Sequence, residues 1–177
     1  MIRKFCLLCA PTLVFAMSQA PQVPNVDAQR AAMRKLSFLI GAWSGSATRW
    51  LKPDSPSELT MTEQATYKLE GLLLTIEGVG AQKADGKPVL QAFGVVSYDD
   101  ASGTYRMRAF NDGRWLESDV TVDEARKELH WGFTIGQIRT KSTLRINDKG
   151  EWTEVHELTI GSNQPWKFME LAVKRQP

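Results

Sequence analysis

Cysteine is scarce in this sequence, and its scarcity excludes several kinds of site. The chain has 177 residues but only two cysteines, Cys6 and Cys9. Both lie in a segment typical of an export signal, with a basic start, an apolar run from Phe5 to Ala16 and small residues up to Ala20. We therefore expect residues 1–20 to be a signal peptide and the mature protein to be periplasmic or secreted. A mature chain without cysteine has no disulfide, no thiolate nucleophile and no cysteine metal site.

An excess of charge and a second long apolar run are also missing. If Arg3 and Lys4 leave with the signal, 20 of the 22 basic residues remain, and they match the 20 acidic ones. A neutral chain has no basic field to attract nucleic acid or anionic lipid. After Ala20, no apolar run approaches the roughly 20 residues that a membrane-spanning helix needs. We therefore expect no nucleic-acid partner and no integral membrane segment in the mature chain.

Motifs of nucleophilic and phosphate chemistry are missing as well. The sequence has no Gly-x-Ser-x-Gly elbow and no glycine-rich phosphate loop before a helix. We therefore expect a binding protein rather than an enzyme. The chain after the signal is long enough for one domain with a core of its own.

What the sequence does contain is a series of short segments rich in Thr, Val, Ile and aromatic residues. Turn pairs such as Asp85-Gly86 and Ser102-Gly103 separate them at regular spacing, which is typical of β-hairpins. Before them, residues 21–35 are expected to form a proline-rich stretch and a short helix capped by Asn25 or Asp27. We predict about ten strands, with centres near Ala47, Glu63, Thr75, Phe93, Met107, Asp119, Leu129, Ser142, Val155 and Glu170.

Several of these segments alternate apolar and polar residues. Between 138 and 146 the even positions are mostly apolar, whereas Arg139, Lys141 and Arg145 occupy odd ones. One-sided burial repeated along a meander implies a barrel or a sandwich, and closure into a barrel removes exposed sheet edges. We therefore predict an all-β protein, an antiparallel up-and-down β-barrel of about ten strands over residues 36–177. A barrel of that size should enclose a cavity.

The segment from Leu36 to Gly45, which contains Gly41-Ala42-Trp43, resembles the first strand of calycins, the lipocalin-like superfamily. The chain is similar to secreted bacterial lipocalin-like proteins of unknown function and, more distantly, to nitrobindin-type haem barrels. The resemblance implies that Gly41 and Trp43 are structural, and that Lys174 or Arg175 packs over Trp43 at the closed end. Counting strand directions predicts the same contact, because the last of ten strands ends at the end of the barrel where the first begins.

We expect a small, mainly apolar molecule to bind inside the barrel, entering at the end opposite Trp43. The loop Lys52–Glu58 lies there as a candidate lid. Five aromatic residues should lie near this mouth: Trp50, Phe110, Trp115, Phe133 and Trp166. Deeper in the barrel, polar residues share a face with apolar neighbours, and buried carboxylates need partners. The predicted ligand-binding residues are Met61, Glu63, Trp115, Phe133, Glu154, His156 and Trp166.

Other hypotheses remain open for the same residues. Glu154 and His156 could simply hydrogen-bond to each other or to a neighbouring arginine, or the strand could face the other way with Val155 pointing inward. The nitrobindin resemblance implies haem with His156 as axial ligand, although this histidine lies on the penultimate strand. A barrel enzyme would use the same two residues as an acid–base pair, and an envelope interaction module would use its outer surface. We expect no metal site, because His130 lies on the opposite face of its own strand.

Overall fold

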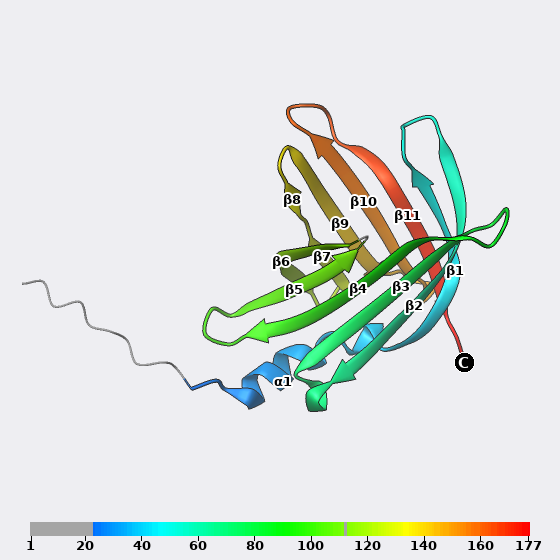
Figure 1. Ribbon diagram of the computed structural model, residues 1–177. Helices are drawn as coiled ribbons and strands as arrows, with labels where there is room; N and C mark the ends of the chain where they lie inside the picture. Colours follow the sequence, from blue (N-terminus) through cyan, green and yellow to red (C-terminus); the bar gives the residue numbers. More distant parts are fainter. Residues whose placement is uncertain (1–22, 112) are drawn as a thin grey trace, which may run out of the picture.

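The chain forms a meander of antiparallel strands that curls round and closes on itself (Figure 1). This computed structural model describes residues 23–111 and 113–177, so the predicted signal peptide lies outside the described residues. The strands are β1 (Gly41–Trp50), β2 (Pro56–Lys68), β3 (Leu73–Gln82), β4 (Pro88–Asp99), β5 (Thr104–Asn111), β6 (Arg114–Asp123), β7 (Glu128–Trp131), β8 (Thr134–Ile135), β9 (Ile138–Ile146), β10 (Trp152–Ile160) and β11 (Trp166–Arg175).

Strand pairing confirms the predicted barrel. Neighbouring strands pair in chain order, and β11 returns to β1 with Arg175 opposite Trp43. β7 and the two-residue β8 both pair with β9, so together they fill one position of a closed 10-strand barrel. Each predicted strand centre falls inside a separate strand, and only β8 was not foreseen.

The wall of the barrel is incomplete between β6 and β8. β6 and β7 pair only over Thr121–Asp123, and β8 pairs with no described strand other than β9. The first half of β6 therefore has a strand partner on its β5 side alone. Gly132 N donates a hydrogen bond to Ser118 Oγ at 3.2 Å, which links the chain just after β7 to β6, near the point where their strand pairing ends.

A short helix, α1 (Val26–Arg34), covers one end of the barrel (Figure 1). Asn25 caps it, since Asn25 Oδ1 accepts a hydrogen bond from Ala28 N at 3.0 Å. Two barrel tyrosines fasten its C-terminal turn: Tyr67 Oη donates to the carbonyl of Met33, and Tyr105 Oη donates to that of Ala32. The helix therefore closes this end of the barrel. The remaining helical turns are η1 (Ser37–Leu39) and η2 (Leu69–Gly71).

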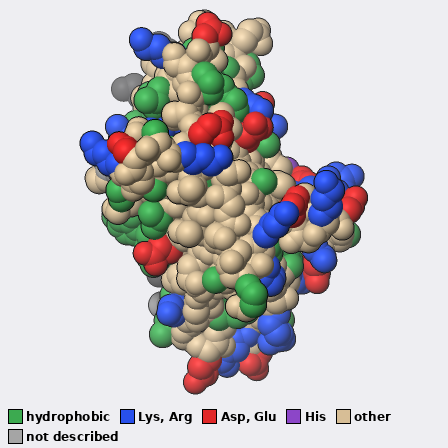
Figure 2. Space-filling view, turned by 90° about the vertical axis from the view of Figure 1, so that its right-hand side faces the viewer, with side chains coloured by type: hydrophobic (Ala, Val, Ile, Leu, Met, Phe, Trp, Pro, Cys, Tyr) green, Lys and Arg blue, Asp and Glu red, His purple; other side chains and the backbone are tan. Residues whose placement is uncertain are grey.

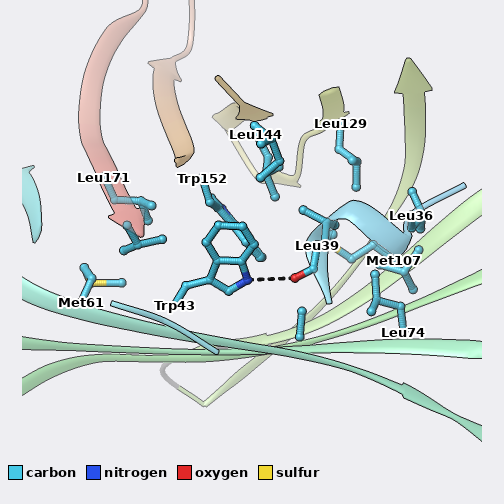
Figure 3. Close-up of a cluster of buried hydrophobic side chains, with 14 of the residues drawn as sticks. Leu36, Leu39, Trp43, Met61, Leu74, Met107, Leu129, Leu144, Trp152 and Leu171 are labelled. Atoms are coloured by element: carbon cyan, nitrogen blue, oxygen red, sulfur yellow. Dashed lines mark hydrogen bonds between the residues drawn. The ribbon is translucent and has the colours of Figure 1, made fainter. Parts of the chain in front are cut away.

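The closed end is a packed apolar core around two tryptophans (Figure 3). Trp43 is 2% exposed, its Nε1 donates to the carbonyl of Leu39 at 2.9 Å, and its ring meets Trp152 edge to face at 5.5 Å. The Arg175 guanidinium lies over the other side, 4.1 Å from the Trp43 ring centre, and donates to the carbonyls of Ile40 and Phe38. The predicted basic side chain over Trp43 is thus Arg175.

Gly41 makes room for that guanidinium. Its φ of +134° disfavours any other residue, and a Cβ there would lie 2.5 Å from Arg175 Nη1. Gly41 and Trp43 therefore serve the same contact, the packing of the Arg175 guanidinium over the indole ring.

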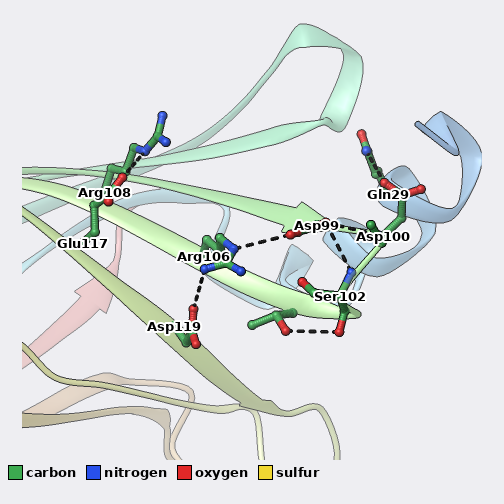
Figure 4. A network of polar contacts seen from close by, with 10 residues as sticks. Gln29, Asp99, Asp100, Ser102, Arg106, Arg108, Glu117 and Asp119 are labelled. Carbon is green, nitrogen blue, oxygen red and sulfur yellow. Dashed lines mark hydrogen bonds and ion pairs between the residues drawn. The ribbon is translucent and has the colours of Figure 1, made fainter. Parts of the chain in front are cut away.

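The outer faces of the strands are polar, as the alternation predicts. Figure 2 shows Lys, Arg, Asp and Glu side chains spread over one face of the molecule, with much of the surface between them tan. On β1 and β2, Ser46, Thr60 and Thr62 are exposed on the outer face. On β5 and β6 the outer face carries ion pairs, including Arg108 with Glu117 at 2.7 Å (Figure 4). None of the described helices is long and apolar enough to cross a membrane.

Candidate functional site

A cavity of about 460 Å³ fills the half of the barrel away from α1. This volume lies within the range of small-molecule sites. Its wall is mostly apolar, because the inward positions of the strands carry Met61, Ile76, Leu90, Met107 and Leu158. Leu51 and Ile135 lie at the rim and are exposed. The cavity therefore opens at the predicted mouth and ends above the tryptophan core.

Glu63 lies at the inner end of this cavity. It stands opposite Trp43 in the β1–β2 register, and its side chain is 7% exposed. Gly78 on β3 leaves the space for it, since a Cβ there would lie 2.8 Å from both carboxyl oxygens. Burial, and secondarily the Glu154 carboxylate, raises the pKa of Glu63 to about 9. At neutral pH Glu63 is therefore an uncharged carboxyl that can donate a hydrogen bond.

Glu154 and His156 form a hydrogen-bonded chain beside Glu63. Trp152 Nε1 donates to Glu154 Oε1 at 2.7 Å, and His156 Nε2 lies 2.8 Å from Glu154 Oε2. On the other side of the imidazole, Nδ1 lies 2.8 Å from Ser142 Oγ, its cross-strand neighbour on β9. The predicted mutual contact of Glu154 and His156 is thus real, and the whole chain faces the cavity. It can present a polar contact to a ligand or hold a proton.

This arrangement does not suit His156 as an axial ligand of haem. An iron–imidazole bond needs one free ring nitrogen, but Glu154 and Ser142 engage both. His130 lies outside the cavity, where it contacts Glu128 at 2.6 Å and Thr143 at 3.1 Å. In residues 23–111 and 113–177, no three His, Asp or Glu side chains come together as metal ligands.

At the mouth, Arg49 points into the barrel. It lies six residues along β1 from Trp43, which is about 20 Å of strand. Its Nη1 donates to the carbonyl of Val89 on β4 at 3.0 Å, so the side chain reaches past β2 and β3. Its Nε is buried without a hydrogen-bond partner among the described residues, and so is Nε1 of Trp166 on β11. Two donors are therefore unsatisfied at this end.

Of the seven predicted ligand-binding residues, five line the cavity and two do not. The five are Met61, Glu63, Phe133, Glu154 and His156. Trp115 is 60% exposed and stacks on Phe110 at 6.2 Å on the outside, because the inward positions of that hairpin belong to neighbours such as Leu116. Trp166 is half-buried beside the cavity rather than in its wall.

Other aromatic residues are also placed differently from the predicted mouth. Trp50 lies under the Lys167 ammonium, 4.9 Å from its ring centre, and does not line the cavity. Trp131, which is not among the predicted mouth residues, lines the cavity and meets the His156 ring edge to face at 6.0 Å. Of the five aromatic residues predicted at the mouth, Phe133 is the one that lines the cavity in the described part of the chain.

Two contributors were missed, although the sequence held a signal for both. Arg49 has the same parity along β1 as the buried Trp43 and Ala47, which predicts an inward side chain. Ser142 has the same parity as Leu144 on β9.

Comparison with known proteins identifies the fold. No protein-family model and no curated protein matches the chain. Rv2717c from M. tuberculosis is similar over 82% of this chain and 98% of its own, with a TM-score of 0.63 and 15% identity. The S-type phycobiliprotein lyase CPES from Guillardia theta is similar over 89% of this chain and 99% of its own, with a TM-score of 0.60 and 8% identity. These two likenesses show the fold, a closed antiparallel β-barrel.

Proposed function

We propose that this barrel binds a small, mainly apolar molecule in its interior and acts as a carrier. The observation that carries this proposal is the cavity itself: about 460 Å³, walled by apolar side chains and open at one end. Such a wall favours an apolar ligand, since water gains little by occupying it. Stability alone does not require such a cavity.

The inner end of the cavity supports a ligand with a neutral polar group at the end that enters first. Glu63 supplies an uncharged carboxyl, and the Glu154–His156–Ser142 chain supplies further polar atoms on the same floor. A few placed polar groups in an apolar site fix the orientation of a ligand. We therefore propose that the ligand enters with its neutral polar group, such as a hydroxyl or carbonyl, facing this floor.

We also propose that the chain works outside the cytoplasm, as a periplasmic or secreted member of the lipocalin-like proteins rather than as a nitrobindin-type haem barrel. Mass spectrometry of the protein from the periplasm or the medium would detect loss of residues 1–20. Retention of the full chain in the cytoplasm would refute export without touching the binding proposal.

Filling the cavity tests the binding proposal. Ala109 on β5 lines the cavity, whereas Ala172 on β11 is exposed on the outer face. Ala109→Phe should weaken binding of the neutral dye N-phenyl-1-naphthylamine at least tenfold, and Ala172→Phe should leave it unchanged. Native mass spectrometry should show a small molecule bound to the wild-type protein and reduced in Ala109→Phe. Equal dye binding by both variants would refute an interior site.

A further inference from the structure

We propose that Arg49 is an anion-binding group, and that the ligand is an amphiphile whose carboxylate lies at the mouth while its chain extends inwards. This inference rests on the proposed function and specifies the class of ligand. It concerns the end of the cavity opposite the Glu63 floor.

The surroundings of Arg49 carry the inference. A guanidinium is charged at every relevant pH and has five donor hydrogens. Here one nitrogen binds the carbonyl of Val89, while Nε is buried and has no partner in the described part of the chain. No described carboxylate forms an ion pair with it, although other arginines such as Arg106 and Arg108 on the outer face have one. Arg49 lines the cavity as a charged group with no carboxylate partner among the described residues, and a ligand carboxylate provides one.

The position of Arg49 decides how the ligand lies. Arg49 occupies the mouth half of β1, opposite Ser57, and the apolar wall lies between it and Glu63. Arg114, at the start of β6, also lines the mouth. The Glu154 carboxylate on the floor would repel an anion, whereas a cationic mouth attracts one. An anionic group therefore stays at the mouth and its alkyl chain fills the cavity.

Trp166 supplies a second donor near the same place. Its Nε1 is buried without a partner among the described residues. Trp166 belongs to β11, the strand next to β1. It comes three residues before Met169, which pairs with Arg49. Trp166 lies beside the cavity, so its indole donates to the second oxygen of a carboxylate only after the ring turns towards the mouth.

Three straight-chain probes test the inference: dodecanoate, dodecanol and dodecylamine, each measured by displacement of N-phenyl-1-naphthylamine. Wild-type protein should bind dodecanoate most tightly and dodecylamine least. Arg49→Met keeps an apolar side chain of similar length and should weaken dodecanoate binding about 10- to 100-fold, the range of a charge-assisted hydrogen bond, with dodecanol changed less than twofold. Arg108→Met, the matched control on the outer face, should change neither.

The outcomes separate this inference from the proposed function. If dodecanol and dodecanoate bind wild-type protein equally, or if Arg49→Met weakens both equally, the anion site is refuted and the carrier remains. If neither the dye nor any probe binds, the carrier proposal itself fails and the anion site with it. Should Arg49→Met not fold, Arg49→Lys keeps the charge and should keep the preference for dodecanoate, and the wild-type order of the three probes is decisive alone.

Discussion

The two ends of the barrel are built from the same strands but differ in whether their polar side chains have hydrogen-bond partners. At the closed end the Trp43 indole donates to the carbonyl of Leu39, and the exposed Arg175 donates to two carbonyls. At the mouth, Arg49 Nε and Trp166 Nε1 are buried and without a partner in the described residues. The helix α1 plugs the first end, whereas a cavity of about 460 Å³ opens at the second.

This difference separates the residues that hold the fold from those available to a ligand. Trp43 and Arg175 each carry an aromatic or a charged group, which could suggest a binding site in any sequence. Their contacts are already complete, so they stabilise the barrel. Arg49 has the same chemistry as Arg175 but an incomplete set of contacts. Mutations at the two ends should therefore affect different measurements.

The largest effect is expected at the closed end. Trp43→Ala should lower the free energy of unfolding by about 3–5 kcal/mol, because it leaves a cavity among fully buried neighbours and removes the platform under Arg175. Urea unfolding followed by circular dichroism measures the change. Trp115→Ala is the matched control, since that ring is 60% exposed, and it should cost less than about 0.5 kcal/mol. Similar losses for the two tryptophans would contradict the division between the ends.

The next effect concerns pH and the floor of the cavity. The pKa of Glu63 is raised from 4.5 to about 9, so the folded protein holds a proton that the unfolded chain releases. The resulting stability is complete below about pH 4.5 and is lost as the pH rises towards 9. Between pH 6 and pH 8 wild-type protein should lose up to about 1.4 kcal/mol per pH unit relative to Glu63→Gln.

Glu77→Gln is the matched control for this measurement, because Glu77 is exposed on the outer face of β3. It should follow the pH dependence of the wild type. A Glu63→Gln protein with the same pH dependence as the wild type would show that Glu63 is already ionised at neutral pH. The floor would then carry a second negative charge and no carboxyl donor.

A smaller effect is expected where α1 plugs the barrel. Tyr105→Phe removes a hydrogen bond of 2.8 Å to the carbonyl of Ala32 and should cost about 1 kcal/mol, or about 2–4 °C in Tm. Burial raises the pKa of Tyr105 to about 12, so alkaline titration should show a late-ionising tyrosine that is missing in Tyr105→Phe. Tyr98→Phe, whose hydroxyl bonds to no described residue, should leave Tm unchanged. A Tyr105→Phe protein as stable as wild type would show that this hydrogen bond does not help to hold the helix.

How much of this could be predicted from sequence differs between the two ends. Alternation and turn pairs place all ten main strands, and strand counting brings the last strand to Trp43, because a closed meander has few possible arrangements. The inward face of β10 follows from its apolar neighbours, so Glu154 and His156 were found. Trp115 was misplaced because both faces near a hairpin end can carry an aromatic ring, and neither hydrophobicity nor aromatic type indicates which face is inward.

Polar residues at the mouth were harder to predict. The position of Arg49 follows from parity with Trp43, but its reach to Val89 depends on strands that are distant in sequence. Unsatisfied donors are properties of three-dimensional packing, and no local pattern reveals them. The closed end could therefore be predicted from sequence, whereas the binding chemistry of the mouth required the structure.

The smallest effect tests whether Trp166 takes part in that chemistry. Trp166→Phe keeps an aromatic ring and removes one neutral donor, so it should weaken dodecanoate binding about fivefold, equivalent to about 1 kcal/mol, and leave dodecanol unchanged. The loss should be smaller than for Arg49→Met, because the indole carries no charge. Trp50→Phe, on the outer face under Lys167, should change neither ligand. If Trp166→Phe weakens the acid and the alcohol equally, its ring supports the mouth by packing, and Arg49 alone distinguishes the two ends of the barrel.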